Sequence, residues 1–130
     1  MTTIFTKIVN GEIPCYKIAE TNEFLAFLDV RPLAAGHTLV IPKQETDYIF
    51  DMDNEQFAAL HLFSKIVADA VKKAVPCKRI GVAVIGLEVP HAHIHLVPMK
   101  EIGDLNFERE RKQFTPEEYQ KIAENIRQHL

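Results

Sequence analysis

The sequence lacks the features of a secreted, membrane-spanning or nucleic-acid-binding protein. Cys15 and Cys77 are its only cysteines, and two isolated thiols make neither a disulfide framework nor a zinc site. No apolar run reaches the ~18 residues of a membrane helix, and no basic-then-apolar leader is recognisable. Fifteen basic and eighteen acidic residues give a formal net charge of −3, so no general field attracts nucleic acid or an anionic membrane. We therefore expect a cytoplasmic protein.

The chain also lacks internal repeats, low-complexity tracts and linkers. Its 130 residues, 47% of them hydrophobic, suffice for one buried core. We expect a single domain over residues 1–130.

Hydrophobic periodicity predicts an α+β fold. Helical spacing predicts a short helical turn over 4–9, a long helix from Asp53 to Ala74 and a C-terminal helix opening at Thr115-Pro116. Strands are predicted over 15–20, 23–30, 37–41, 80–85 and the stretch between Pro90 and Pro98. The prediction is an antiparallel sheet of about five strands with two main helices. The charged segment 100–113 is expected to be a surface loop.

The most unusual feature is a run of alternate histidines. His91, His93 and His95, three of the six histidines, fall within five residues. In an extended strand, alternate side chains share a face, so the imidazoles would lie on one side and the intervening apolar residues on the other. We interpret the run as a strand with its apolar face on the core and its imidazole face lining a cleft.

Two kinds of chemistry use such a row. Two histidines at i and i+2 can chelate zinc, but the Cα atoms of His91 and His95 would lie roughly 13 Å apart on a straight strand. A third ligand would have to come from His37 or Glu88. Alternatively, the middle imidazole attacks phosphorus and carries the group covalently, while its neighbours bind the phosphate oxygens and manage the leaving-group proton. The second chemistry uses the row as it stands.

Four segments resemble the histidine triad (HIT) family in consistent order over residues 4–98, which leaves 99–130 as a C-terminal loop and helix. They read IFTKIVNGEIP from residue 4, LAFLDV from residue 25, GHTLVIPK from residue 36 and HAHIH from residue 91. The chain is most similar to the Hint branch, whose members are homodimeric nucleotide-binding proteins that cleave nucleoside phosphoramidates and related adenylates. The resemblance implies a HIT-like fold, a purine nucleotide substrate, a homodimer, and neither a cofactor nor a catalytic metal.

The resemblance also implies roles for individual residues. His93 would be the nucleophile, with His95 and His37 beside the α-phosphate and His91 supporting the nucleophile. Asp29 would accept hydrogen bonds from the ribose hydroxyls. The apolar pocket for the base is implied at Ile4, Phe5, Ile8, Phe27, Leu28, Val30 and Leu39. The first three of these fit a protein core as well as a pocket.

The chain departs from the family pattern at two places. Thr3 and Thr6 stand where many relatives carry a pair of cysteines that hold structural zinc with a histidine, so a zinc site of that type is not expected. The segment 85–90 is shorter than the glycine-rich loop of relatives, and its Glu88 would place a negative charge near a phosphate. This second departure is expected to affect the specificity for the leaving group and the rate of catalysis.

The predicted function is therefore a nucleotidyl hydrolase or transferase that acts on purine nucleoside phosphoramidates or adenylates through a covalent histidine intermediate. The altered loop favours an alternative, a nucleotide-binding module with weak or vestigial catalysis. The row of imidazoles alone favours another, a metal-binding protein. A two-fold dimer is expected to pair through the strand 80–85 and the helix from Asp53 to Ala74.

Overall fold

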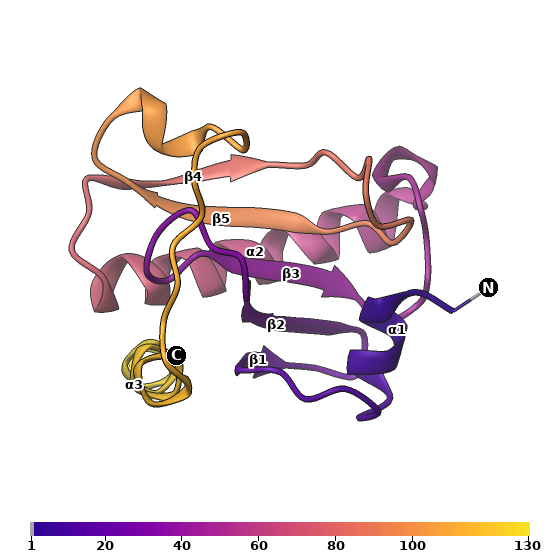
Figure 1. Ribbon diagram of the computed structural model, residues 1–130. Helices are drawn as coiled ribbons and strands as arrows, with labels where there is room; N and C mark the ends of the chain where they lie inside the picture. The colour runs from indigo at the N-terminus through magenta and orange to yellow at the C-terminus, as the bar shows by residue number, and fades with distance from the viewer. Residues whose placement is uncertain (1) are drawn as a thin grey trace.

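A computed structural model describes residues 2–130 of the protein. Its centre is a five-stranded sheet of order β1-β2-β3-β5-β4 (Figure 1). All four neighbouring pairs are antiparallel. The strands are β1 (Lys17–Glu20), β2 (Phe24–Leu28), β3 (Thr38–Pro42), β4 (Arg79–Ala83) and β5 (Ile94–Met99). The predicted α+β class is confirmed.

The helices begin where the sequence supplies capping groups. They are α1 (Ile4–Val9), α2 (Asn54–Ala74), α3 (Pro116–Arg127) and the 3₁₀ turns η1 (Ile49–Asp51) and η2 (Ile102–Leu105). The Asp53 carboxylate caps α2 by accepting from the N–H of Gln56, and Thr115 caps α3 in a reciprocal capping box with Glu118. Among residues 2–130, no helix combines the length and the apolar composition needed to cross a bilayer.

One face of the sheet carries the main hydrophobic core. In Figure 1, α2 runs behind the sheet, where it packs against β2, β3, β4 and β5, while α3 packs against β1 and β2. The predicted stripe of α2 points into this core at Leu60, Val67 and Val71, each 0% exposed. The sheet contributes Ile18, Phe24, Ala26, Leu28, Val40, Ile94 and Leu96.

The opposite face carries a smaller apolar cluster beneath α1. It contains Phe5, Leu25, Phe27, Leu39 and Ile41. Since both faces are covered, β2 and β3 are buried along their whole length. His95 pairs with Leu39 across β3 and β5 and so belongs to this second face.

The histidine strand differs from its predicted bounds. β5 starts at Ile94, so His91 and His93 lie in the irregular segment that leads into it. Pro98 was expected to end the strand, but β5 continues to Met99. The reason is that β3 pairs with β5 only as far as Leu96. Beyond this point β5 is paired on one side only, where a proline is tolerated. The other strands end within a few residues of their predicted bounds.

The core packing predicts the effect of truncating α2. Leu60→Ala removes a fully buried side chain and should lower the free energy of unfolding by roughly 2–5 kcal/mol. Leu87→Ala is the matched control, because Leu87 is 89% exposed, and it should change stability by less than about 0.5 kcal/mol. Denaturant unfolding measures both, and equal losses would contradict the packing described here.

Candidate functional site

Four histidines gather on the face of the sheet that α1 partly covers. His37 immediately precedes β3, His95 lies in β5, and His91 and His93 come from the segment before β5. All four are buried, with exposed fractions between 0% and 7%. The ring centroid of His95 lies 4.9 Å from that of His93 and 5.2 Å from that of His37. The structure therefore brings together the histidines that the sequence singled out.

The ring of His93 is oriented by the backbone. Its Nδ1 lies 2.8 Å from the carbonyl oxygen of His91. A carbonyl oxygen only accepts hydrogen bonds, so Nδ1 carries a proton and, in the neutral ring, Nε2 keeps its lone pair. Within the described part of the chain, that Nε2 has no hydrogen-bond partner. His93 thus presents a free basic nitrogen.

The side chain of His91 is held from both ends. Its Nε2–H donates to the carbonyl of Pro42 at 2.7 Å, and its Nδ1 accepts from the hydroxyl of Thr3 at 2.9 Å. Glu45 accepts from the N–H of Thr3 at 2.9 Å and from the hydroxyl of Thr6 at 2.7 Å. Thr3 and Thr6 therefore form a hydrogen-bonded cluster with His91, which fixes the segment whose carbonyl orients His93.

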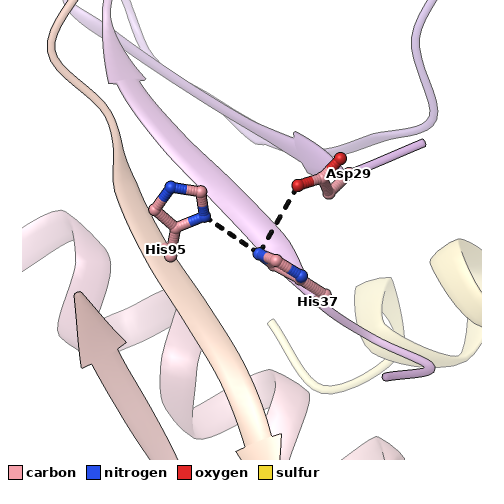
Figure 2. Close-up of side chains that lie close together, drawn as sticks. All are labelled: Asp29, His37 and His95. Atoms are coloured by element: carbon pink, nitrogen blue, oxygen red, sulfur yellow. Dashed lines mark hydrogen bonds and ion pairs between the residues drawn. The ribbon is translucent and has the colours of Figure 1, made fainter. Parts of the chain in front are cut away.

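The pair His37–His95 has a defined proton arrangement. The backbone N–H of Leu33 donates to Nδ1 of His37 at 2.9 Å, so in the neutral ring Nε2 of His37 carries the proton. That Nε2 faces Nδ1 of His95 at 3.0 Å and a carboxylate oxygen of Asp29 at 3.5 Å (Figure 2). Nδ1 of His95 then accepts, and Nε2 of His95 carries the proton. The chain of donors that begins at Leu33 ends in an N–H on His95.

Burial keeps these imidazoles uncharged. It lowers the pKa of His37 to about 3, with further contributions from the charges of Arg111 and His93. It lowers the pKa of His95 to about 3 as well, while the nearby Asp29 carboxylate acts in the opposite direction. Burial also lowers the pKa of His91. At neutral pH, His95 can therefore donate a hydrogen bond without carrying a positive charge.

Asp29, His37 and His95 also meet the distance requirement for a metal site. Their ligand atoms lie within 4.8 Å of one another. A metal would need a lone pair on Nε2 of His37. The Leu33 N–H already uses the lone pair on Nδ1 and so leaves the proton on Nε2. The hydrogen-bond pattern therefore suits a donor chain better than a cation site.

The apolar residues that the resemblance assigned to a base pocket do not all share this face. Phe5, Phe27 and Leu39 belong to the cluster under α1, and Ile8 packs against it half-buried. The Phe5 ring meets that of His93 edge-on, with centroids 5.1 Å apart. Ile4 and Val30 are 50% and 67% exposed. Leu28 instead packs into the core on the α2 side, because adjacent residues of a strand point to opposite faces.

The acidic residues differ in environment. Asp29 follows β2 and accepts from the N–H of Arg31 at 2.8 Å. Glu88 is exposed in the loop before the triad and lines a cavity of about 620 Å³. Glu45 and Asp47 line the same cavity. The loop before the triad and the segment after β3 therefore place carboxylates around this cavity, whose lining includes none of the buried imidazoles.

Two residues at the site were not predicted from the sequence. The ring of Phe107 meets that of His95 edge-on with centroids 4.6 Å apart, and the guanidinium of Arg111 lies 5.6 Å from the Phe107 ring centroid. Both fall in the segment expected to be a surface loop. A single phenylalanine in a charged run was the only signal available there.

Comparisons with known proteins find relatives that cover most of this chain. The family model described as HIT domain matches residues 10–102. The chain is 35% identical over 129 residues to adenosine 5'-monophosphoramidase hnt1 of Schizosaccharomyces pombe, covering 97% of this chain and 96% of that protein. It is 33% identical over 103 residues to adenylylsulfatase HINT3 of Arabidopsis thaliana, covering 75% of this chain and 52% of that protein. The crystal structure of a Hit-like protein from Bartonella henselae superposes with a TM-score of 0.86 at 33% identity, covering 99% and 96% of the two chains.

The lowered histidine pKa values predict acid sensitivity. Between the ordinary value of 6.5 and the folded value of about 3, unfolded His37 binds a proton that the folded protein excludes. The contribution of His37 to the free energy of unfolding is therefore complete above pH 6.5 and is lost as the pH falls through this window. His37→Asn should make the free energy of unfolding less dependent on pH there, whereas His61→Asn, on the exposed side of α2, should not. Denaturant titrations at several pH values test this, and parallel curves for wild type and His37→Asn would refute it.

Proposed function

The chain belongs to the HIT domain family, and from that membership we propose that it is a nucleotidyl hydrolase or transferase. The proposed substrates are phosphoramidate or phosphoanhydride derivatives of purine nucleoside monophosphates. Relatives named as a phosphoramidase and an adenylylsulfatase support this class of reaction. The observation that carries the proposal is the hydrogen bond from Nδ1 of His93 to the His91 carbonyl, since it leaves Nε2 free to act as a nucleophile.

In the first step, Nε2 of His93 attacks the α-phosphorus. A P–N bond to His93 forms, the bond to the leaving group breaks with its electron pair, and the leaving atom takes up a proton from the medium. The ring of His93 becomes positively charged, and the His91 carbonyl that accepts from its Nδ1 stabilises that charge. The N–H of His95 donates to the phosphate oxygen or the leaving atom.

In the second step, water attacks the same phosphorus. The bond to Nε2 of His93 breaks, the nucleoside monophosphate leaves, and the water loses a proton to the medium. The free imidazole is restored. An alcohol or amine in place of water gives the transferase reaction.

The nucleotide would lie along the face beneath α1. Asp29 stands at the end of β2 with one carboxylate oxygen held by the Arg31 N–H and the other facing His37, and in the proposal it accepts from the ribose hydroxyls. The exposed side chains of Ile4 and Val30 offer apolar surface to the base. The remaining members of the proposed base pocket are Phe5, Ile8, Phe27 and Leu39.

Three acidic side chains around one cavity support a second candidate function. Glu88, Glu45 and Asp47 line one cavity, and their charges oppose the approach of a phosphate to that side. A nucleotide-binding module with weak turnover would fit this arrangement. Glu88→Gln separates the two, because a large gain in turnover would show that Glu88 limits catalysis, whereas an unchanged low rate would favour the binding module.

The nucleophile predicts a clear loss of function. His93→Ala should abolish turnover of an adenosine phosphoramidate while binding of adenosine monophosphate survives, since the attacking nitrogen is removed and the proposed ribose and base contacts remain. His61→Ala, which changes an exposed histidine on α2, is the control. The steady-state rate and calorimetric binding are the measurements, together with a mass search for an adenylyl adduct on His93. Activity of His93→Ala within about tenfold of wild type would contradict the mechanism.

We also propose that the protein is a two-fold dimer. β4 is an edge strand of the sheet, and such an edge offers unpaired backbone groups to a second copy. Large apolar side chains are exposed beside it, with Leu62 and Ile66 of α2 at 65% and 61% and Val82 of β4 at 56%. An isologous pairing of β4 and α2 would cover them.

Light scattering at micromolar concentration tests the dimer. The wild-type mass should be twice 14.8 kDa, and Ile66→Asp should shift it toward the monomer because a carboxylate would be buried at the interface. Leu87→Asp, at a site 89% exposed in the loop outside β4 and α2, should leave the mass unchanged. A wild-type mass near 14.8 kDa would rule out the proposed assembly.

A further inference from the structure

A segment near the C-terminus covers the histidine pair. We name residues 106–112, between η2 and α3, the strap. In Figure 1 this orange segment crosses the sheet on the side opposite α2. The ring of Phe107 meets His95 at an interplanar angle of 70° and lies 6.2 Å from the ring centroid of His37. Phe107 thus packs on the end of the histidine row opposite the Phe5 contact with His93.

The strap is tied to the turn that fixes the ring of His37. Arg111 donates through Nη1 to the Arg31 carbonyl at 2.6 Å and through Nη2 to the Phe107 carbonyl at 3.0 Å. The N–H of Lys112 donates to the Pro32 carbonyl at 2.8 Å. The next residue of that turn, Leu33, supplies the N–H that fixes the proton on His37. The strap and the turn therefore form one hydrogen-bonded unit around the pair.

We propose that Phe107 and Arg111 are positioning residues for His95, which keep its ring dry, uncharged and turned so that Nε2–H faces the substrate. The inference rests on the proposed function for the role of that N–H in catalysis. Its structural basis is independent of it: the Phe107 ring excludes water from one side of His95, and Arg111 clamps the Phe107 backbone.

Most of the groups around His95 oppose its protonation. His37, His93 and Arg111 each oppose a positive charge on His95, and Asp29 is the one group that favours it. Removal of the Phe107 ring would admit water, which solvates an imidazolium. Removal of the Arg111 charge would leave the Asp29 carboxylate freer to stabilise a positive charge on His95. Both changes raise the affinity of His95 for a proton.

A proton on His95 would disrupt the pair. Nδ1 of His95 accepts from Nε2–H of His37 at 3.0 Å. If Nδ1 were protonated, two N–H groups would face each other across this distance, and the ring would have to turn away. The strap therefore preserves the orientation of His95 by preserving its charge state.

Imidazole ¹⁵N resonances of His95, followed against pH in the full nucleotide-free chain, test the proposal directly. Phe107→Ala and Arg111→Gln should each raise the pKa of His95, by about one unit or more for Phe107→Ala. Phe107→Leu, which keeps an apolar cover, and Arg111→Lys, which keeps the charge, should restore most of the wild-type titration. Phe50→Ala, which removes a ring 69% exposed on η1, is the control and should change nothing.

Kinetics of the same variants supply the second measurement. Phe107→Ala should lower kcat about tenfold and change KM less than about threefold, because the donor and not the nucleotide site is disturbed. A His95 titration in Phe107→Ala and Arg111→Gln identical to wild type would overturn the proposal, as would an equal shift in Phe50→Ala. A wild-type protein without turnover would defeat the proposed function alone, since the resonances would still decide the role of the strap.

Discussion

The hydrogen bond from the Leu33 N–H to Nδ1 of His37 decides the arrangement of the whole donor chain. A backbone N–H can only donate, so it sets one lone pair of His37 and leaves the proton on the other nitrogen. His95 then has to accept through Nδ1 and donate through Nε2. The backbone carbonyl of His91 imposes the opposite arrangement on His93. The Leu33 N–H and the His91 carbonyl thus give the neighbouring rings of His95 and His93 complementary roles. Nε2 of His95 donates a proton, and Nε2 of His93 offers a lone pair.

The donor chain persists only while the rings of His37 and His95 are uncharged, and burial supplies that condition. The two-sided core keeps β2 and β3 buried along their whole length, while Phe5 and Phe107 pack against the two ends of the histidine row. Desolvation of an imidazolium is costly, so the pKa of His37 and of His95 falls to about 3. The same burial fixes the proton positions at neutral pH and lowers the stability of the protein in acid.

The sequence predicted the local part of this structure well. Alternation identified the histidine row, and capping residues located α2 and α3 closely. His91, His93 and His95 are all buried even though β5 starts only at Ile94. A side chain can be buried without belonging to a hydrogen-bonded strand. The resemblance assigned Leu28 to the base pocket together with Phe27. Adjacent residues of a strand point to opposite faces, and Leu28 packs in the core on the α2 side. The roles of Thr3 and Phe107 depend on contacts with distant residues, which periodicity does not encode.

The separation of these partners along the chain has a consequence for how the site forms. Thr3 contacts a histidine 88 positions later, and His37 bonds to one 58 positions later. Each contact closes a long loop, and the entropy of closing that loop must be lost before the contact can stabilise the fold. During synthesis, His37 is complete long before its partner in β5 emerges. The constellation of imidazoles therefore arises together with the central strand pairing of β3 and β5, and no shorter N-terminal fragment holds its geometry.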